Sequence, residues 1–209
     1  MRYLIRSTLA AAALLAAACA HAGNQLEEQM SASVRAALSK AVSDQSTPFL
    51  AFATDSEART WLDSMSHRLE RRMPDRTLRE DFLVTVHYEA KRAGLDPQMV
   101  LGLIQVESAF RKYAISSAGA RGLMQVMPFW IDVIGTRETN LFHLRTNLRF
   151  GCAILRHYLD MERGDLFRAL GRYNGSLGRP EYPNLVLGAW RQWDFTPLAG
   201  GVIKTGNER

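Results

Sequence analysis

Apolar residues recur at intervals of three or four positions along most of the chain, which is the period of amphipathic helices. The pattern predicts a first helix that ends at SDQSTP and a second that runs from Asp55 to the MPD segment. Thr77 with Glu80 has the form of a capping box that begins a third helix. Strand patterns are scarce and no internal repeat is visible, so we expect an all-α, predominantly helical fold.

The second half of the chain carries clear helix boundaries. Asp96 followed by Pro97 is a strong start signal, because Asp caps a helix N-terminus and Pro suits its first position. Glycines at 119 and 122 predict a turn, and a short helix over 123–127 ends at Pro128. Further helices are expected over 129–135, over 144–163 as the longest, over 166–173 and over 181–193.

Residues 1–22 have the pattern of a secretory signal peptide: two arginines, a short Ala/Leu run and an Ala20-His21-Ala22 cleavage site. The apolar run is shorter than the roughly 20 residues that a membrane-spanning helix needs, which disfavours a retained anchor. Cys19 offers another alternative, since LAAAC is close to a bacterial lipoprotein signal with Ala16 in place of the usual leucine. We favour cleavage after Ala22, and expect an exported, periplasmic protein that is an outer-membrane lipoprotein only if Cys19 is lipidated.

Three parts follow the signal: an N-terminal helical segment over 23–76, a compact helical domain over 77–195 and a loose tail over 196–209. Cys152 is the only cysteine outside the signal and lies on an apolar helical stripe, so we expect it in the core and not as a nucleophile. The formal charge of +5 falls to +3 without the two signal arginines, and no Lys/Arg block is present. This charge suits an anionic polymer or surface, whereas export and the missing basic stripe argue against nucleic acid.

Glu107 is the main candidate for chemistry, because its spacing places it on one helical face with Val100, Leu103 and Phe110. A carboxyl group among apolar neighbours tends to keep its proton near neutral pH. A general acid that protonates a leaving glycosidic oxygen needs that state. Spacing alone leaves an alternative open, in which the glutamate lies at the edge of this face and pairs with the basic residues 111–112.

Three short segments carry the candidate motifs, in this order: ESAF at 107–110, SSAGARGLMQVMP at 116–128 and RYNG at 172–175. Together they resemble the catalytic domain of the soluble lytic transglycosylases, which share the lysozyme-like fold with goose-type lysozyme. The resemblance covers roughly residues 80–195. Where the third motif usually has alanine, this chain has Arg172, which can reach solvent or bind carboxylates of the substrate. This departure affects subsite detail and not the expected fold.

The resemblance assigns roles around the catalytic carboxyl group. It makes Glu107 the single catalytic acid and base, and it makes Ser108 a residue that fixes the local backbone and the glutamate. Tyr173 matches the tyrosine whose hydroxyl hydrogen-bonds the catalytic carboxyl. Asn174 matches an asparagine near the acetamido or peptide-bearing groups of the substrate.

The resemblance also implies that residues of the second motif bind the glycan. Ser116 matches a serine that approaches the N-acetyl group of the sugar, and Gln125 and Met127 match residues that line the glycan groove. Gly119 and Gly122 allow a sharp turn close to a sugar, and an amide side chain offers two donors and an acceptor. For Met127, plain core packing is an equally good interpretation.

The three motifs contain one candidate acid, whereas glycosidases generally use two carboxylates. Four acids elsewhere are more simply explained as solvated or capping residues: Asp132, Glu138, Asp165 and Glu181. The resemblance implies that protonated Glu107 gives its proton to the MurNAc-β-1,4-GlcNAc oxygen. It then takes the C6 hydroxyl proton as a 1,6-anhydro sugar forms without water. We expect no metal and no cofactor, since the histidines show no ligand spacing.

Two alternatives remain beside a peptidoglycan lytic transglycosylase. One is a hydrolytic muramidase similar to goose-type lysozyme. The other is a non-catalytic peptidoglycan-binding scaffold of a secretion apparatus, which the intact motif set disfavours because a binder needs no buried acid. The expected partners are peptidoglycan glycan strands and no nucleic acid. Recruitment by cell-envelope machinery, endo or exo action and the role of residues 23–76 stay open.

Overall fold

The computed structural model describes residue 25 and residues 29–195, so the predicted signal peptide and the predicted tail over 196–209 lie outside the described residues. The described part contains helices and isolated β-bridges but no strand, so the predicted all-α fold is confirmed. None of its helices is long and apolar enough to cross a membrane. In chain order they are α2 (Ala32–Val42), α3 (Asp55–Leu69), α4 (Arg76–Arg92), α5 (Pro97–Ser108), α6 (Phe129–Ile134), α7 (Leu144–Met161), α8 (Leu166–Asn174) and α9 (Glu181–Arg191).

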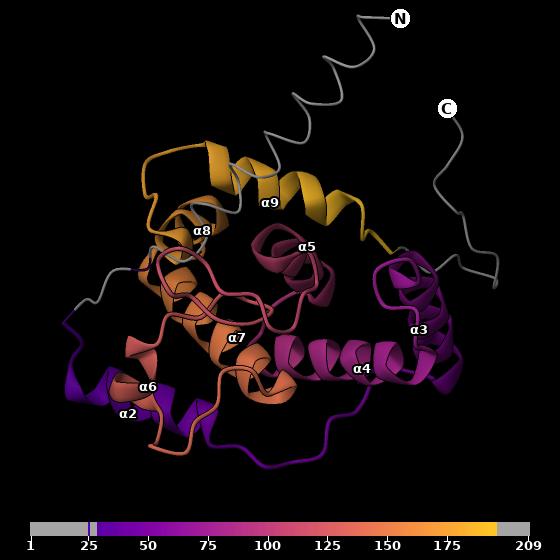
Figure 1. Ribbon diagram of the computed structural model, residues 1–209, viewed down its shortest axis with the longest axis horizontal. Helices are drawn as coiled ribbons and strands as arrows, with labels where there is room; N and C mark the ends of the chain where they lie inside the picture. The colour runs from indigo at the N-terminus through magenta and orange to yellow at the C-terminus, as the bar shows by residue number, and fades with distance from the viewer. Residues whose placement is uncertain (1–24, 26–28, 196–209) are drawn as a thin grey trace, which may run out of the picture.

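Helix α5 lies in the middle of the molecule (Figure 1) and packs against α4 and α9. Its predicted start is confirmed, because the Asp96 carboxylate accepts hydrogen bonds from the first-turn N–H groups and Pro97 is the first helical residue. The closest neighbour is α9: a Cβ on Gly102 would lie 2.7 Å from the backbone nitrogen of Trp190. Only glycine permits this approach, which brings the two backbones into contact.

Helix α7 is the longest helix and forms the other large part of the core, against α2, α4 and α8. Cys152 lies on it with 1% of its surface exposed, so the prediction that it is a core residue is confirmed. At Gly151, a Cβ would lie 2.4 Å from the sulfur of Met124. The segment that follows α5 therefore packs directly on the surface of α7.

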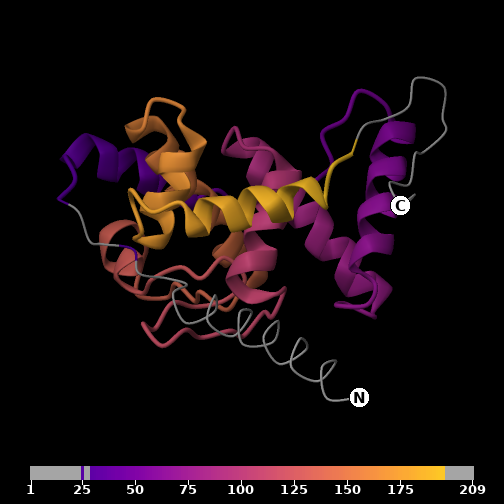
Figure 2. The same ribbon diagram turned by 90° about the horizontal axis from the view of Figure 1, so that it is seen from above.

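Helices α2 and α3 lie at opposite ends of the molecule in both views (Figures 1 and 2). Helix α2 packs on α6 and α7, whereas α3 packs on α4. The chain between them, residues 43–54, passes along the same side of the molecule as α4 (Figure 1). The division of the chain at residue 76 stays a prediction.

Two local predictions are wrong. The N-cap of α4 is Asp75, whose Oδ1 accepts the Leu78 N–H at 2.9 Å, so Thr77 lies inside the first turn and forms no capping box. Residues 123–127 form no helix, because Arg121 and Val126 pair as an antiparallel bridge and Gln125 has a left-handed backbone with φ 48°. Tertiary contacts with α7 decide the shape of this segment, which overrides its helical propensity.

Candidate active site

Glu107 lies one residue before the end of α5, with 3% of its surface exposed. The other members of its predicted face, Val100, Leu103 and Phe110, are also buried, which confirms the spacing argument. No ion pair joins the carboxyl to Arg111 or Lys112 within the described chain. Burial is the main cause that raises the pKa of Glu107 from 4.5 to about 8. The carboxyl group is therefore mainly protonated at neutral pH.

The hydroxyl of Tyr182, in the first turn of α9, donates a hydrogen bond to Oε1 of Glu107. This contact partly opposes the effect of burial on the glutamate's pKa, because it stabilises the ionised form. In the described structure, Oε2 is buried and has no hydrogen-bond partner. The two oxygens thus differ: Oε1 is held by the protein, whereas Oε2 is left for another group.

The prediction that the Tyr173 hydroxyl contacts the catalytic carboxyl is wrong. Tyr173 is fully buried, and its hydroxyl donates to the carbonyl oxygen of Met124 at 2.7 Å. The reason is geometric, since α9 and not α8 packs along the C-terminal half of α5 and brings Tyr182 to Glu107. Tyr182 is in the sequence segment EYP, which carried no motif that pointed to the site.

The chain turns sharply directly after α5. Ala109 and Phe110 both have left-handed backbones, with φ 50° and 65°. Such conformations are unfavourable for residues with a Cβ and persist only where the surroundings impose them. Here Phe110 is 4% exposed and its ring packs edge-on against Phe82 and Trp193. The buried aromatic contacts therefore fix the turn beside the candidate acid.

The segment over 114–126 is organised by Asn147 of α7, a residue that the sequence did not single out. Its amide nitrogen donates to the carbonyls of Arg121 and Leu141, each at 2.8 Å, and its oxygen accepts the Met124 N–H at 2.8 Å. At Gly122, which has φ 76°, a Cβ would lie 2.4 Å from the amide nitrogen of Asn147. Gly122 is therefore required for close packing against the Asn147 side chain, and not for the approach of a sugar as we expected.

Gln125 is 2% exposed, and its side-chain nitrogen donates to the carbonyls of Ala114 at 3.2 Å and Gly122 at 2.8 Å. Both amide protons are used within the segment, so only the side-chain oxygen remains for a ligand. Met127 is half-buried and packs against the core, so both interpretations of this residue stay open. Ser116 is also half-buried, and its hydroxyl accepts the Ala120 N–H at 3.1 Å.

The two residues next to the predicted acid and the predicted tyrosine are buried. Ser108 is fully buried and donates to the Ile104 carbonyl one turn earlier in α5, which agrees with a role in fixing the local backbone. Asn174 is 3% exposed at the last position of α8, before the left-handed cap Gly175. Of the predicted substrate-binding residues, Ser116 and Met127 have the most accessible surface. Apart from the Tyr173 contact, the predicted roles of these residues stay predictions.

One ionisable carboxyl group, that of Glu107, lies at this site. The causes that set the pKa of Glu107 are burial and the Tyr182 hydroxyl, and no second carboxylate in the described chain contributes. Asp165 caps α8 through the Arg168 N–H, as expected, and Asp132, Glu138 and Glu181 are exposed. No cluster of three potential metal-binding side chains occurs in the part of the chain that the structure describes.

Comparison with known proteins identifies relatives for this region. The family model "Transglycosylase SLT domain" matches residues 85–182. A transglycosylase of Enterobacteria phage PRD1 is 35% identical over 98 residues, which are 47% of this chain and 36% of the phage protein. Membrane-bound lytic murein transglycosylase C of Actinobacillus pleuropneumoniae is 53% identical over 47 residues, which are 22% of this chain and 13% of that protein. The chain thus spans little more than a third, or less, of the length of these relatives.

One solved structure is also similar. It is an inactive mutant of the lytic transglycosylase Slt from Pseudomonas aeruginosa, with a TM-score of 0.42 and 22% sequence identity. The similarity covers 65% of this chain and 25% of that chain.

Proposed function

We propose that the chain is a peptidoglycan lytic transglycosylase with Glu107 as its catalytic acid and base, since residues 85–182 match the transglycosylase SLT domain. The observation that carries the proposal is the buried Glu107, whose pKa of about 8 keeps it protonated at neutral pH. A protonated carboxylic acid is the group needed to cleave a glycosidic bond. The phage relative is named a transglycosylase and the Actinobacillus pleuropneumoniae relative a lytic murein transglycosylase, and both names agree with the proposal.

In the first step, Glu107 protonates the oxygen of the MurNAc-β-1,4-GlcNAc bond. Because Oε1 accepts a hydrogen bond from the Tyr182 hydroxyl, the acidic proton resides on Oε2, the oxygen without a partner in the described chain. As the C1–O bond breaks, the acetamido carbonyl of the same sugar stabilises the positive charge at C1. The substrate thereby supplies what a second carboxylate supplies in other glycosidases.

In the second step, ionised Glu107 takes the proton of the C6 hydroxyl while that oxygen attacks C1. The products are a 1,6-anhydro sugar and a shortened strand, no water is consumed, and the carboxyl group regains its proton. The Tyr182 hydroxyl contributes between the two steps, because its hydrogen bond stabilises the ionised carboxylate. One residue can serve as acid and then base because its environment places its pKa near the working pH.

Product analysis of purified sacculi tests this proposal. The wild-type chain should release 1,6-anhydro-muropeptides, which are lighter by one water than the reducing-end products of a muramidase. Glu107→Gln is nearly isosteric, keeps an acceptor for Tyr182 and should abolish release while the chain stays folded. Reducing-end products would establish the hydrolytic alternative, and unchanged release by Glu107→Gln would refute the catalytic assignment. Binding to sacculi without any release would support the scaffold alternative.

We further propose that the chain acts in the cell envelope, in the periplasm. The signal-like residues 1–22 and the membrane-bound relatives support this location. The intact mass of the mature protein tests how the signal segment is processed. Cleavage after Ala22 gives an unmodified chain that begins at residue 23, whereas lipidation gives a chain that begins at a diacylated Cys19. Pull-down from crosslinked envelopes would identify any machinery that recruits the chain to its glycan strands.

A further inference from the structure

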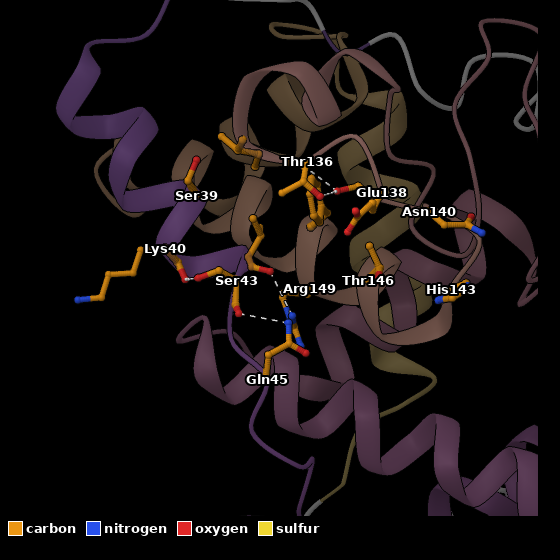
Figure 3. A pocket seen from close by; sticks show the side chains of 15 residues that line it. Ser39, Lys40, Ser43, Gln45, Thr136, Glu138, Asn140, His143, Thr146 and Arg149 are labelled. Atoms are coloured by element: carbon orange, nitrogen blue, oxygen red, sulfur yellow. Dashed lines mark hydrogen bonds between the residues drawn. The ribbon is translucent and has the colours of Figure 1, made fainter.

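A polar pocket of about 620 Å³ lies between the C-terminal end of α2 and the segment that leads from α6 into α7; we call it the α2–α7 pocket. Figure 3 shows Ser43 on its α2 side and Thr136, Glu138 and Thr146 on the other side. Its volume is in the range of roughly 300–1,000 Å³ that is common for small-ligand pockets. None of the seven predicted site residues lines it, so it is separate from the candidate active site.

The α2 side of this pocket is held in place by three arginines. Arg92, Arg145 and Arg149 each donate a hydrogen bond to a backbone carbonyl within residues 41–46, at 2.6 Å for Arg92 and 3.1 Å for Arg149. Some of these carbonyls end α2, where cations are favoured by the helix dipole. The wall of the pocket is therefore fixed before a ligand arrives, which lowers the entropy lost on binding.

The same arginines surround a buried acid, and we call this group the Glu89 cluster: Glu89, Asp44, Arg92, Arg145 and Arg149. The Glu89 side chain is 0% exposed, and its oxygens lie 3.0–3.3 Å from nitrogens of the three arginines. Asp44 lies 3.7 Å from Arg92 and 3.6 Å from Arg145. Three guanidinium groups against two carboxylates leave the Glu89 cluster with one net positive charge, and Arg149 is the member of the cluster that lines the pocket.

The opposite side of the pocket carries the reverse charge. Glu138 is exposed on the segment between α6 and α7, and among the described residues that line the pocket it is the only acidic one. Hydroxyl and amide groups also line the pocket, with Thr146 on the Glu138 side and Gln45 next to Arg149 (Figure 3). The pocket therefore matches a ligand that has a carboxylate at one end, an ammonium at the other and amides between them.

We propose that the α2–α7 pocket binds the peptide stem of peptidoglycan, with a stem carboxylate beside Arg149 and a stem ammonium beside Glu138. This inference rests on the proposed function, since a peptidoglycan substrate carries both groups next to the glycan that Glu107 cuts. The lining favours peptide over sugar: no Trp or Tyr among its described residues offers a face for a sugar, and Phe150 is 2% exposed. A second contact on the same polymer raises the effective concentration of the glycan at the active site.

Titration of the full chain with the synthetic tripeptide L-Ala-γ-D-Glu-L-Lys tests the proposal, because this probe contains no sugar and no bond that Glu107 could cut. Chemical-shift mapping should locate the peptide at residues 39–45 and 134–149. Glu138→Gln should weaken the affinity by about fivefold or more, as should acetylation of the peptide ammonium. Glu57→Gln, on α3 at the other end of the molecule, is the matched control and should leave the affinity unchanged.

A steric pair tests the same site without a change in charge. Ser39 lies half-buried in the pocket wall, so Ser39→Trp should fill the pocket and abolish binding. Ala36→Trp, at an exposed position of α2 outside the lining, should bind normally. Circular dichroism of both variants establishes that the helices remain folded.

Several results would overturn the proposal. These are shift changes confined to residues 107–127, equal affinity for Glu138→Gln and wild type, or displacement of the peptide by tri-N-acetylchitotriose. Equal binding of the ordinary peptide L-Ala-L-Glu-L-Lys would also overturn it, because the pocket would then not recognise a stem. Glu107→Gln should bind the tripeptide like wild type, so that failure of the catalytic proposal and failure of this one are separate observations.

Discussion

The hydrogen bond from Tyr182 to Glu107 gives a quantitative prediction for the substitution Tyr182→Phe, which removes one hydroxyl from a buried site. The hydroxyl stabilises the ionised carboxylate, and hydrogen bonds to charged groups contribute about 1.5–3 kcal/mol. At about 1.4 kcal/mol per pKa unit, its removal should raise the pKa of Glu107 by about one to two units. The wild-type pKa is about 8, so the variant should keep its proton to a distinctly higher pH.

The assay is the pH dependence of kcat/KM for release of soluble fragments from labelled sacculi, since this profile reports ionisations of the free enzyme. A general acid must be protonated, so activity falls as pH rises through the pKa of Glu107. The alkaline limb of the wild-type profile should lie near pH 8, and that of Tyr182→Phe about one to two units higher, with a lower maximal rate. The lower rate follows because the base in the second step loses its stabilising donor.

Tyr173→Phe is the matched control, because it also removes a buried phenol hydroxyl but one that donates to the Met124 carbonyl. It should leave the alkaline limb of the profile unmoved. An unchanged or lowered limb in Tyr182→Phe would refute the reasoning, as would an equal shift in both variants. Thermal melts of the two proteins check that their folded fractions are comparable.

Four other substitutions give predictions about stability. Between pH 4.5 and about 8 the folded chain keeps a proton on Glu107 that the unfolded chain releases, so its stability falls as pH rises. Glu107→Gln should therefore raise the free energy of unfolding by about 3 kcal/mol at pH 7 in urea titrations, and by almost nothing below pH 4.5. Glu89→Gln should cost about 3–5 kcal/mol in the same assay, because it leaves three arginines facing an uncharged group, and a loss below about 1 kcal/mol would contradict this. Gly102→Ala should lower the free energy of unfolding by about 1–3 kcal/mol, because the added Cβ meets the α9 backbone. Gly188→Ala, with open space around it, should raise the free energy of unfolding by about 0.4–1 kcal/mol. Similar effects of the two substitutions would be inconsistent with close contact between α5 and α9.

Much of the fold follows from local sequence signals. The helix starts at Asp96 and Asp165 are predictable because a side chain caps its own backbone within three residues. Helical periodicity also places Glu107 on the face of Val100 and Leu103, although this spacing alone left an edge position open and the structure decided for burial. The left-handed cap at Gly175 also lies within a few residues of the helix that it ends.

Features that depend on distant contacts were not predictable in this way. Gln125 lies in a segment with helical propensity, yet contacts with α7 force its backbone into the left-handed region. Asn147 looked like one polar residue at the start of a long helix, although it joins three backbone groups of other segments. Glu89 is an unremarkable acid in the sequence, and its full burial depends on arginines up to 60 residues away.

Tyr173 and Tyr182 show most clearly what the sequence determines and what only the tertiary structure decides. The sequence by itself determined most of the helices, the order of the three motifs and the helical face on which Glu107 lies, because each depends on residues that are close along the chain. Only the tertiary structure decided that Tyr182 and not Tyr173 reaches Glu107, 75 residues away, and that Oε2 is the oxygen left free. The physical reason is the contact of α5 with α9 through Gly102, a packing of two backbones that no local pattern encodes.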